Sequence, residues 1–269
     1  MKKQKFLFMA IAMVALLSAS CTDPEEPEQP TPTPTPVNNS FPNSMPACAP
    51  FVDQIIDGGF ENQWFNQTTS FDTYLEYRST VFYSLNSLHT LMDIPAMQVT
   101  QSPITAHCDS VTPHTGRFAL KLVTGELTDA SHGRLLIPGA IAPLDTDYVS
   151  QFLYSDLYPD GINVKRPYTA RPTVFKGYYR YAPVAGDSAS MLVRLYDGNQ
   201  IIGEGVQMVY NDVNAWTQFD AHINYTSSAT PTHIALILSS SAGYNFADLT
   251  NCQGQVGSTL WIDDLEFGF

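Results

Sequence analysis

The chain has 269 residues, of which 13 are basic and 26 are acidic, so its formal net charge at pH 7 is −13. Three of the lysines lie within the first five residues, and the remaining basic residues form no cluster, which argues against nucleic acid as a partner. Charged residues make up only 14% of the chain and aromatic residues 12%, a composition typical of a β protein.

The first 20 residues predict a signal peptide. Lys2, Lys3 and Lys5 form a positively charged segment, and residues 6–17 form an apolar segment. This apolar segment has the length expected of a signal peptide and is shorter than the roughly 20 residues that span a bilayer. We therefore expect residues 1–20 to direct export of the chain.

Cys21 follows the small residues Ser18, Ala19 and Ser20, and this segment resembles a bacterial lipobox. It departs from the usual pattern at Ser18, where a lipobox commonly has Leu. The resemblance implies lipidation of Cys21, and the acyl chains would anchor the protein at about 0.8 kcal/mol per buried CH₂ group. The alternative is an ordinary secretory signal in which Cys21 has no special role.

Residues 21–40 predict a linker that follows this cysteine. Residues 22–36 alternate proline with small or acidic residues, which favours an extended polyproline stalk with no core of its own. The acidic residues of the stalk resemble the signal that sends lipoproteins of Bacteroidetes to the outer face of the outer membrane: Asp23, Glu25, Glu26 and Glu28. We expect surface display, while solubility alone would also explain these charges.

Residues 41–269 predict one all-β domain, a jelly-roll β-sandwich of two antiparallel sheets. Short apolar runs alternate with turn residues, and no long stretch has helical periodicity. The expected strands cover residues 53–56, 117–124, 175–181, 190–196, 201–209, 217–225, 233–239 and 259–267. Asp197-Gly198 between two of these runs is a strong hairpin signal.

Two parts of this region leave alternatives open. Residues 80–92 fit either a helix or a loop with a short strand. After Cys21, the chain has three cysteines, Cys48, Cys108 and Cys252, so at least one of them stays outside any intramolecular disulfide. The sequence does not say which of them pair.

Three separated segments carry a resemblance to a known group of domains. Residues 55–61 read Ile-Ile-Asp-Gly-Gly-Phe-Glu, residues 114–122 read His-Thr-Gly-Arg-Phe-Ala-Leu-Lys-Leu, and residues 257–265 include Trp-Ile-Asp-Asp. Their order resembles that of jelly-roll carbohydrate-binding modules, in which the corresponding strands lie in one sheet. Residues 171–183, Arg-Pro-Thr-Val-Phe-Lys-Gly-Tyr-Tyr-Arg-Tyr-Ala-Pro, resemble the core of the carbohydrate-metabolism domain of Bacteroidetes lipoproteins. Arg180 departs from this pattern, which commonly has Lys at that position.

The resemblance implies a sugar context and a structural Ca²⁺ ion. The matching ligands would be Glu61 and Asp263, with Asp264 as a further candidate, and backbone carbonyls near residues 116–118. Ca²⁺ takes 6–8 oxygen ligands, which these groups could supply. The alternative is that Glu61 and Asp263 accept hydrogen bonds from backbone amides and close the sheet without a metal. No other cofactor is expected.

Sugar binding would use exposed aromatic and planar polar side chains, because pyranose rings stack on aromatic faces. In residues 175–181, alternation places Phe175, Tyr179 and Tyr181 on the core face and Lys176, Tyr178 and Arg180 on the solvent face. We expect a platform for a glycan from six residues: Arg171, Tyr178, Arg180, Tyr244, Asn245 and Phe246.

Two other functions remain as alternatives. A glycoside hydrolase or lyase would need two carboxyl groups facing each other across a cleft, and Asp145, Asp147, Asp156 and Asp160 are candidates without a fixed pair. A structural or adhesive subunit of the cell envelope would need neither a pair of carboxyl groups nor a sugar-binding platform. The favoured interpretation is an outer-membrane lipoprotein on the cell surface that binds a glycan and serves its capture or utilisation.

Overall fold

A computed structural model describes residues 57–77, 82–93, 95, 98–130, 133–142, 165–244 and 251–269. The chain divides into two units, Met1–Ala47 and Cys48–Phe269, and every described residue belongs to the second unit. The predicted signal peptide, the lipidation site Cys21 and the stalk lie outside the described residues, as does the expected strand at residues 53–56. No helix in the described part of the chain combines the length and the apolar character needed to cross a membrane.

One sheet has five antiparallel strands, and it contains strands from the second and the last of the three segments that carry the resemblance. Its order is β14-β11-β17-β6-β5. The strands are β14 (Val213–His222), β11 (Val174–Ala182), β17 (Thr259–Gly268), β6 (Ala119–Val123) and β5 (Ala106–Asp109). The last strand of the chain therefore lies in the centre of this sheet, with hydrogen bonds to β11 on one side and β6 on the other.

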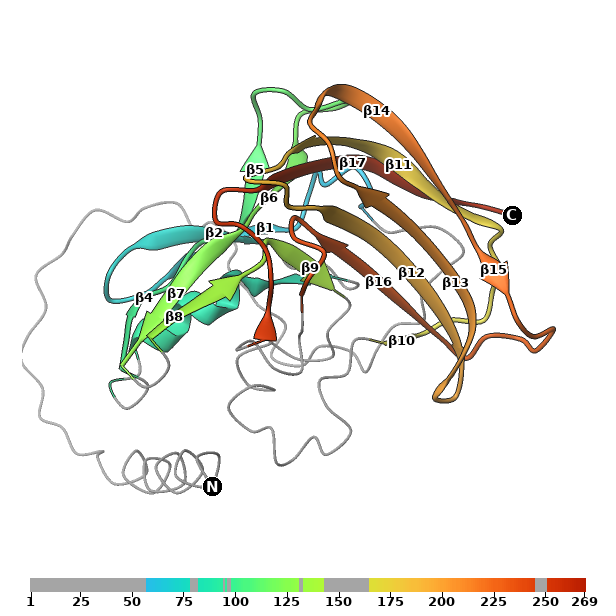
Figure 1. The fold of residues 1–269 in the computed structure, drawn as a ribbon, viewed down its shortest axis with the longest axis horizontal. Coiled ribbons are helices and arrows are strands. Elements are labelled where there is room, and N and C mark those ends of the chain that lie inside the picture. Colours follow the sequence, from blue (N-terminus) through green and yellow to red (C-terminus); the bar gives the residue numbers. More distant parts are fainter. Residues whose placement is uncertain are drawn as a thin grey trace, which may run out of the picture. The chain divides into compact units, whose positions relative to one another are not determined.

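The second sheet has seven strands, six of which follow the order β15-β13-β12-β16-β9-β3, while β10 pairs with β16. Its strands are β15 (Asn224–Tyr225), β13 (Gln200–Val209), β12 (Ala189–Asp197), β16 (His233–Ser239), β9 (Ala140–Ala142), β3 (Tyr83–Ser84) and β10 (Arg166–Pro167). β12 and β13 form the hairpin expected at Asp197-Gly198, where Gly198 has a positive φ of 59°. Figure 1 shows β14, β11 and β17 in one layer and β13, β12 and β16 in the other.

The chain passes repeatedly from one sheet to the other, which defines the topology. The main strands in sequence are β6, β9, β11, β12, β13, β14, β16 and β17, and they lie in the orders β14-β11-β17-β6 and β13-β12-β16-β9. Two four-stranded sheets connected in this way are a jelly roll. The predicted all-β, jelly-roll sandwich is confirmed.

The core lies between these two sheets. From the five-stranded sheet it receives side chains such as Phe175, Tyr181 and Leu260, and from the seven-stranded sheet side chains such as Val193 and Leu236, all of them inaccessible to solvent. Along β11, partly exposed and buried positions alternate over the whole strand, as predicted. The solvent-facing positions of β11 are therefore Lys176, Tyr178 and Arg180.

The outer faces of the two sheets differ. On the seven-stranded sheet, Leu192 and Ile237 point outward, yet both are buried under a second apolar cluster. A 3₁₀ helix, η1 (Leu85–Asp93), contributes Leu85, Leu88 and Leu91 to this cluster. Residues 80–92 fit either a helix or a loop with a short strand, and the described part contains a strand and a helix, since β3 immediately precedes η1.

Two small antiparallel sheets accompany the sandwich. One has the order β4-β7-β8, formed by β4 (Val99–Gln101), β7 (Gly125–Asp129) and β8 (Gly133–Ile137). The other is a two-stranded ribbon of β1 (Trp64–Thr68) and β2 (Thr73–Tyr77). The sequence did not predict these short strands.

The segment before β1 joins the middle of β17. The Leu265 amide donates to the carbonyl oxygen of Gly58 at 2.9 Å, an approach so close that a Cβ at Gly58 would collide with this backbone. Glu61 then accepts hydrogen bonds from the backbone amides of Arg117 (2.7 Å) and Phe118 (3.1 Å) in the loop between β5 and β6. Gly116, with φ of +63°, provides the room for this carboxylate.

Glu61 is predicted to stabilise the fold through these two amides. Glu61→Ala leaves both N–H groups without their charged acceptor, and we expect the free energy of unfolding to fall by about 2 kcal/mol. Urea denaturation at pH 7 measures this change. The matched control is Glu266→Ala in β17, which removes an exposed ion pair with Lys176 and should cost less than about 1 kcal/mol. Equal losses in the two variants would contradict the role of Glu61.

Candidate functional site

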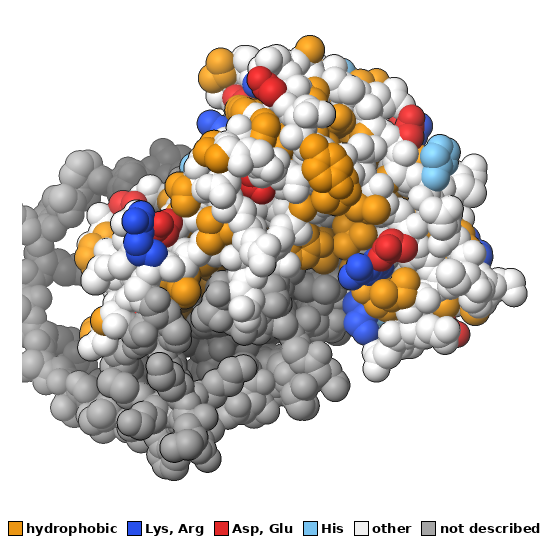
Figure 2. Space-filling view, viewed as in Figure 1, with side chains coloured by type: hydrophobic (Ala, Val, Ile, Leu, Met, Phe, Trp, Pro, Cys, Tyr) orange, Lys and Arg blue, Asp and Glu red, His pale blue; other side chains and the backbone are white. Residues whose placement is uncertain are grey.

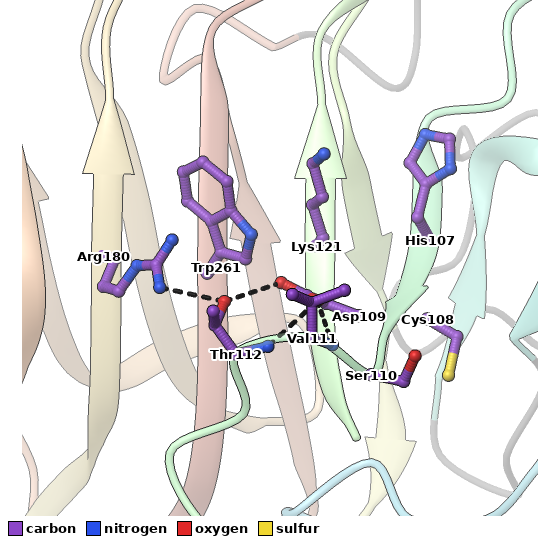
Figure 3. Close-up of a pocket in the computed structure, with 9 residues that line it drawn as sticks. All are labelled: His107, Cys108, Asp109, Ser110, Val111, Thr112, Lys121, Arg180 and Trp261. Atoms are coloured by element: carbon purple, nitrogen blue, oxygen red, sulfur yellow. Dashed lines mark hydrogen bonds between the residues drawn. The ribbon is translucent and has the colours of Figure 1, made fainter. Parts of the chain in front are cut away.

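A row of five side chains crosses the outer face of the five-stranded sheet, with one residue from each strand. We call it the cross-strand row, and it consists of His107, Lys121, Trp261, Arg180 and Trp216. The register pairs His107 with Lys121, Lys121 with Trp261, and Trp261 with Arg180. Directly paired residues of antiparallel strands share a face, so these side chains lie next to one another. Figure 3 shows His107, Lys121, Trp261 and Arg180 side by side on neighbouring strands.

A bulge brings Trp216 to the end of the row. Tyr179 pairs with Thr217, but Tyr181 pairs with Val213, so residues 214–216 lie opposite Arg180 alone. A bulge of this kind redirects a side chain, and here it places the indole of Trp216 beside the Arg180 guanidinium. The centre of that guanidinium is 5.5 Å from the Trp216 ring and 4.6 Å from the Trp261 ring.

Cations and rings alternate along the row. Lys121 Nζ lies 5.6 Å from the centre of the Trp261 ring, on the side opposite to Arg180 in the strand order. Trp261 therefore has a cationic side chain on each flank. Every member of the row is partly exposed, so rings and charged groups are accessible to a molecule in solvent.

The loop between β5 and β6 forms one wall of the site. Asp109 accepts from the Val111 amide at 2.8 Å and from the Thr112 hydroxyl at 3.2 Å. Thr112 in turn accepts from Arg180 Nη1 at 3.0 Å through its hydroxyl and from Trp216 Nε1 at 3.0 Å through its carbonyl. The loop thus holds Arg180 and Trp216 in place, and part of this network is drawn in Figure 3.

These elements enclose a shallow pocket of about 360 Å³. Its lining residues are His107, Cys108, Asp109, Ser110, Val111, Thr112, Lys121, Arg180 and Trp261. Burial would raise the pKa of Asp109, but the amides of Val111 and Thr112 and the Thr112 hydroxyl lower it below its usual value. Asp109 is therefore an anion at neutral pH.

Two other groups of the pocket are neutral near pH 7. Burial, together with the charge of Lys121, lowers the pKa of His107 below its usual value, so its imidazole carries no charge. Burial, with the charges of Asp109 and Glu61, raises the pKa of the Cys108 thiol to about 11. Cys108 is a free cysteine, and at that pKa it is a poor nucleophile.

Beside the row, Tyr178 stacks on His114 with ring centres 3.7 Å apart and an angle of 18° between the planes. His114 Nδ1 lies 2.7 Å from a carboxylate oxygen of Asp264, and the Thr115 hydroxyl donates to the other oxygen at 2.7 Å. The Trp216 ring meets His114 edge-on at 5.8 Å. Tyr178 and Trp216 thus enclose the loop residue His114, which extends the aromatic surface beyond the pocket.

The structure unites only part of the predicted glycan platform. Tyr178 and Arg180 lie on this face, but Arg171 precedes β11 at its other end. There the Arg171 guanidinium donates to the carbonyl oxygens of Ser227 (3.0 Å) and Ala229 and covers the Tyr225 ring, so it fixes a turn. Tyr244 packs against the second apolar cluster, and burial raises its pKa to about 12. Asn245 and Phe246 lie outside the described residues.

Trp261, Lys121 and His107 were not predicted as site residues. Trp261 and Lys121 both lie in segments that the sequence analysis assigned to strands, but alternation alone does not show which strands are neighbours. The pairing of β17 with β6 and β11 is what brings them beside Arg180. The bulge that positions Trp216 has no signal in the sequence.

The three predicted calcium ligands lie close together. An added Cβ on Gly59 would come within 4 Å of Glu61, Asp263 and Asp264. Asp263 Oδ2 accepts from the amides of His114 (2.8 Å) and Thr115 (3.2 Å), and Asp263 Oδ1 accepts from the Asp264 amide at 2.9 Å.

The groups that face Glu61 and Asp263 are therefore N–H donors, whereas Ca²⁺ needs oxygen ligands. No group of three or more acidic, His or Cys side chains in the described ranges is arranged to hold a metal ion. These contacts match the alternative in which Glu61 and Asp263 accept hydrogen bonds from backbone amides. Binding of Ca²⁺ stays a prediction, which melting temperatures measured with and without the ion can test.

The structure does not describe the candidate acids for catalysis. Asp145, Asp147, Asp156 and Asp160 lie outside the described residues. Among the described residues that line the pocket, Asp109 is the one carboxylic acid, and a glycosidase needs two.

No protein-family model and no curated protein matches the chain. Among solved structures, it is similar to two Bacteroides proteins that are each named a "putative glycoside hydrolase". The one from Bacteroides vulgatus is 19% identical with a TM-score of 0.55, over 78% of this chain and 96% of that chain. The one from Bacteroides thetaiotaomicron is 16% identical with a TM-score of 0.51, over 77% of this chain and 71% of that chain. At these identities, the similarity shows a shared fold.

Asp263 gives the fold a measurable pH dependence. It is fully buried, and burial, with the charge of Asp264, raises its pKa from 3.8 to about 6 despite three amide donors. Because the folded state binds this proton more tightly, the contribution of Asp263 to stability is present below pH 4 and is lost as the pH rises through 6.

We therefore expect the wild type to gain stability relative to Asp263→Asn as the pH falls from 7 to 4, by on the order of 2 kcal/mol. Urea denaturation of both proteins across this range isolates the effect, because all other titrating groups are shared. A stability difference that does not change with pH would contradict the raised pKa.

Proposed function

We propose that the protein captures a glycan on the cross-strand row. One observation carries this proposal: Trp261 and Trp216 lie on either side of Arg180 on the outer face of a regular sheet. Pyranose rings present C–H groups that pack on aromatic faces, and their hydroxyls need hydrogen-bonding partners beside the rings. The row provides both, in an order that matches successive units of a chain-like ligand.

The rigidity of the platform supports the same proposal. Trp261 stands on the central strand β17, and the β5–β6 loop holds Arg180 and Trp216 by hydrogen bonds. A site that is formed before its ligand arrives loses less conformational entropy on binding. The groups of the row need no metal or cofactor to contact a sugar.

The cellular setting of the proposal comes from the sequence. A lipid on Cys21 and the proline-rich stalk would hold the domain at the outer membrane, with the row exposed outside the cell. A glycan-binding lipoprotein in this position would serve the capture or utilisation of polysaccharides. Its only link to the membrane would be the lipid anchor.

Cleavage of a glycan, by hydrolysis or by a lyase reaction, is the second candidate function. It is suggested by the name of the two similar Bacteroides structures. The pocket contains one carboxylic acid among its described residues, which is sufficient for binding but not for acid–base catalysis by a carboxyl pair. A release of reducing ends during the binding assay would favour this candidate, and their absence would favour capture alone.

Trp261→Ala is expected to weaken glycan binding at least about tenfold, because it removes the ring at the centre of the row. A glycan array followed by calorimetry with the best ligand measures the loss. The control is Phe71→Ala, which removes an exposed ring in the turn between β1 and β2 and should leave binding unchanged. Circular dichroism checks that both variants fold. Full binding by a folded Trp261→Ala variant, or no glycan bound by the wild type, would contradict the proposal.

A further inference from the structure

We propose that the pocket in the cross-strand row binds an acidic sugar, one with a carboxylate or sulfate group beside its ring. This inference rests on the proposed function and narrows its ligand class. It starts from the two cations that flank Trp261, since the hydrogen-bonding partners of a neutral glycan need carry no charge.

Lys121 and Arg180 point to the pocket without a carboxylate partner among the described residues. Three other basic groups on strands lie directly against acids: Arg134 with Glu126, Lys176 with Glu266, and Arg194 with Glu204. On the face drawn in Figure 2, some basic side chains are seen beside acidic ones. In a chain with a net charge of −13, acids are available, yet the two cations at Trp261 are left for another partner.

Arg180 retains unused hydrogen-bonding capacity. Its one hydrogen bond to the described residues runs from Nη1 to the Thr112 hydroxyl. Its Nε is buried and has no acceptor there. A guanidinium has five N–H donors in a plane and is well suited to carboxylate and sulfate oxygens. Arg180 can therefore hold the loop through Nη1 and donate to a ligand through Nη2.

The charge of the pocket favours an anion. Asp109 is the one acid in its lining, and its charge is already directed to the amides of Val111 and Thr112. His107 is neutral because its pKa is lowered. Lys121 and Arg180 therefore leave the lining with a net charge of +1 in an otherwise strongly acidic protein.

The positions of these groups suit one sugar unit. A pyranose stacked on Trp261 would have Lys121 on one flank and Arg180 on the other, at 5.6 Å and 4.6 Å from the ring centre. An anionic substituent at the edge of that sugar would meet a cation whichever way the chain ran. His107 and the hydroxyl of Ser110 remain for neutral hydroxyls of the ligand.

The test uses the full chain, purified in a detergent without a sugar headgroup, and three polymers. These are polygalacturonate, the same polymer after chemical reduction of its carboxyl groups, and a sulfated galactan. Calorimetry gives each dissociation constant at low and high salt. We expect at least one anionic polymer to bind about tenfold or more tightly than the reduced polymer, with the advantage lost at high salt.

The variants assign this preference to the pocket. Lys121→Gln should weaken binding of the preferred anionic polymer about tenfold and change binding of the reduced polymer less than about twofold. Lys176→Gln is the matched control, because it removes a cation from the same sheet face that is already paired with Glu266. We expect it to change neither constant by more than about twofold.

The outcomes separate this inference from the proposed function. Equal binding of anionic and reduced polymers, or equal losses in the two lysine variants, would overturn the acidic-sugar inference while leaving glycan capture in place. Failure of the folded chain to bind any glycan, on this panel and on the array, would overturn both. Preference for the sulfated or the carboxylated polymer alone would support the inference and identify the anion.

Discussion

The pairing of β17 on both sides is the interaction on which the rest of the structure depends. This last strand closes the five-stranded sheet between β11 and β6, and the segment that precedes β1 bonds to it through Gly58 and Leu265. The strand contains a bulge where Asp264 adopts a positive φ of 51° and where Asp263 caps the β5–β6 loop. Without these strand pairings, Trp261 would have no cationic neighbours, and the β5–β6 loop would have no fixed position.

A difference between the two outer faces determines where a ligand can bind. On the seven-stranded sheet, the leucines of η1 bury Leu192 and Ile237, so the described part of that face serves stability. On the five-stranded sheet, the described residues leave Trp261, Arg180 and Trp216 partly exposed, although aromatic rings of this size are usually used to fill a core. The bulge at Trp216 and the hydrogen bonds of Thr112 keep these side chains on the surface in fixed positions.

Local patterns in the sequence predicted the long strands and their faces, but they could not predict the contacts between strands. The alternation in β11 placed Tyr178 and Arg180 on the solvent face, and the structure confirms this because the period of a strand is local information. The meeting of Trp261 with Lys121 and Arg180 depends on register between strands that are distant in sequence, which alternation does not contain. Arg171 was expected in the same platform as Arg180, yet it binds carbonyl oxygens at the opposite end of β11. The carboxylates of Glu61, Asp263 and Asp264 were expected to lie together, and the structure confirms this. The expectation was correct because the order of the three motifs reflects the topology of the sheet.

The most direct test of the account is an NMR spectrum of the indole N–H groups during titration with a bound oligosaccharide. The chain has three tryptophans, so each gives one assignable signal. Trp216 and Trp261 belong to the cross-strand row, whereas the indole of Trp64 donates to the Phe60 carbonyl and packs on Tyr77. We predict that the signals of Trp216 and Trp261 move on titration and that the signal of Trp64 stays in place. Movement of the Trp64 signal alone, or no movement while calorimetry records binding, would contradict the assignment of the row as the glycan site.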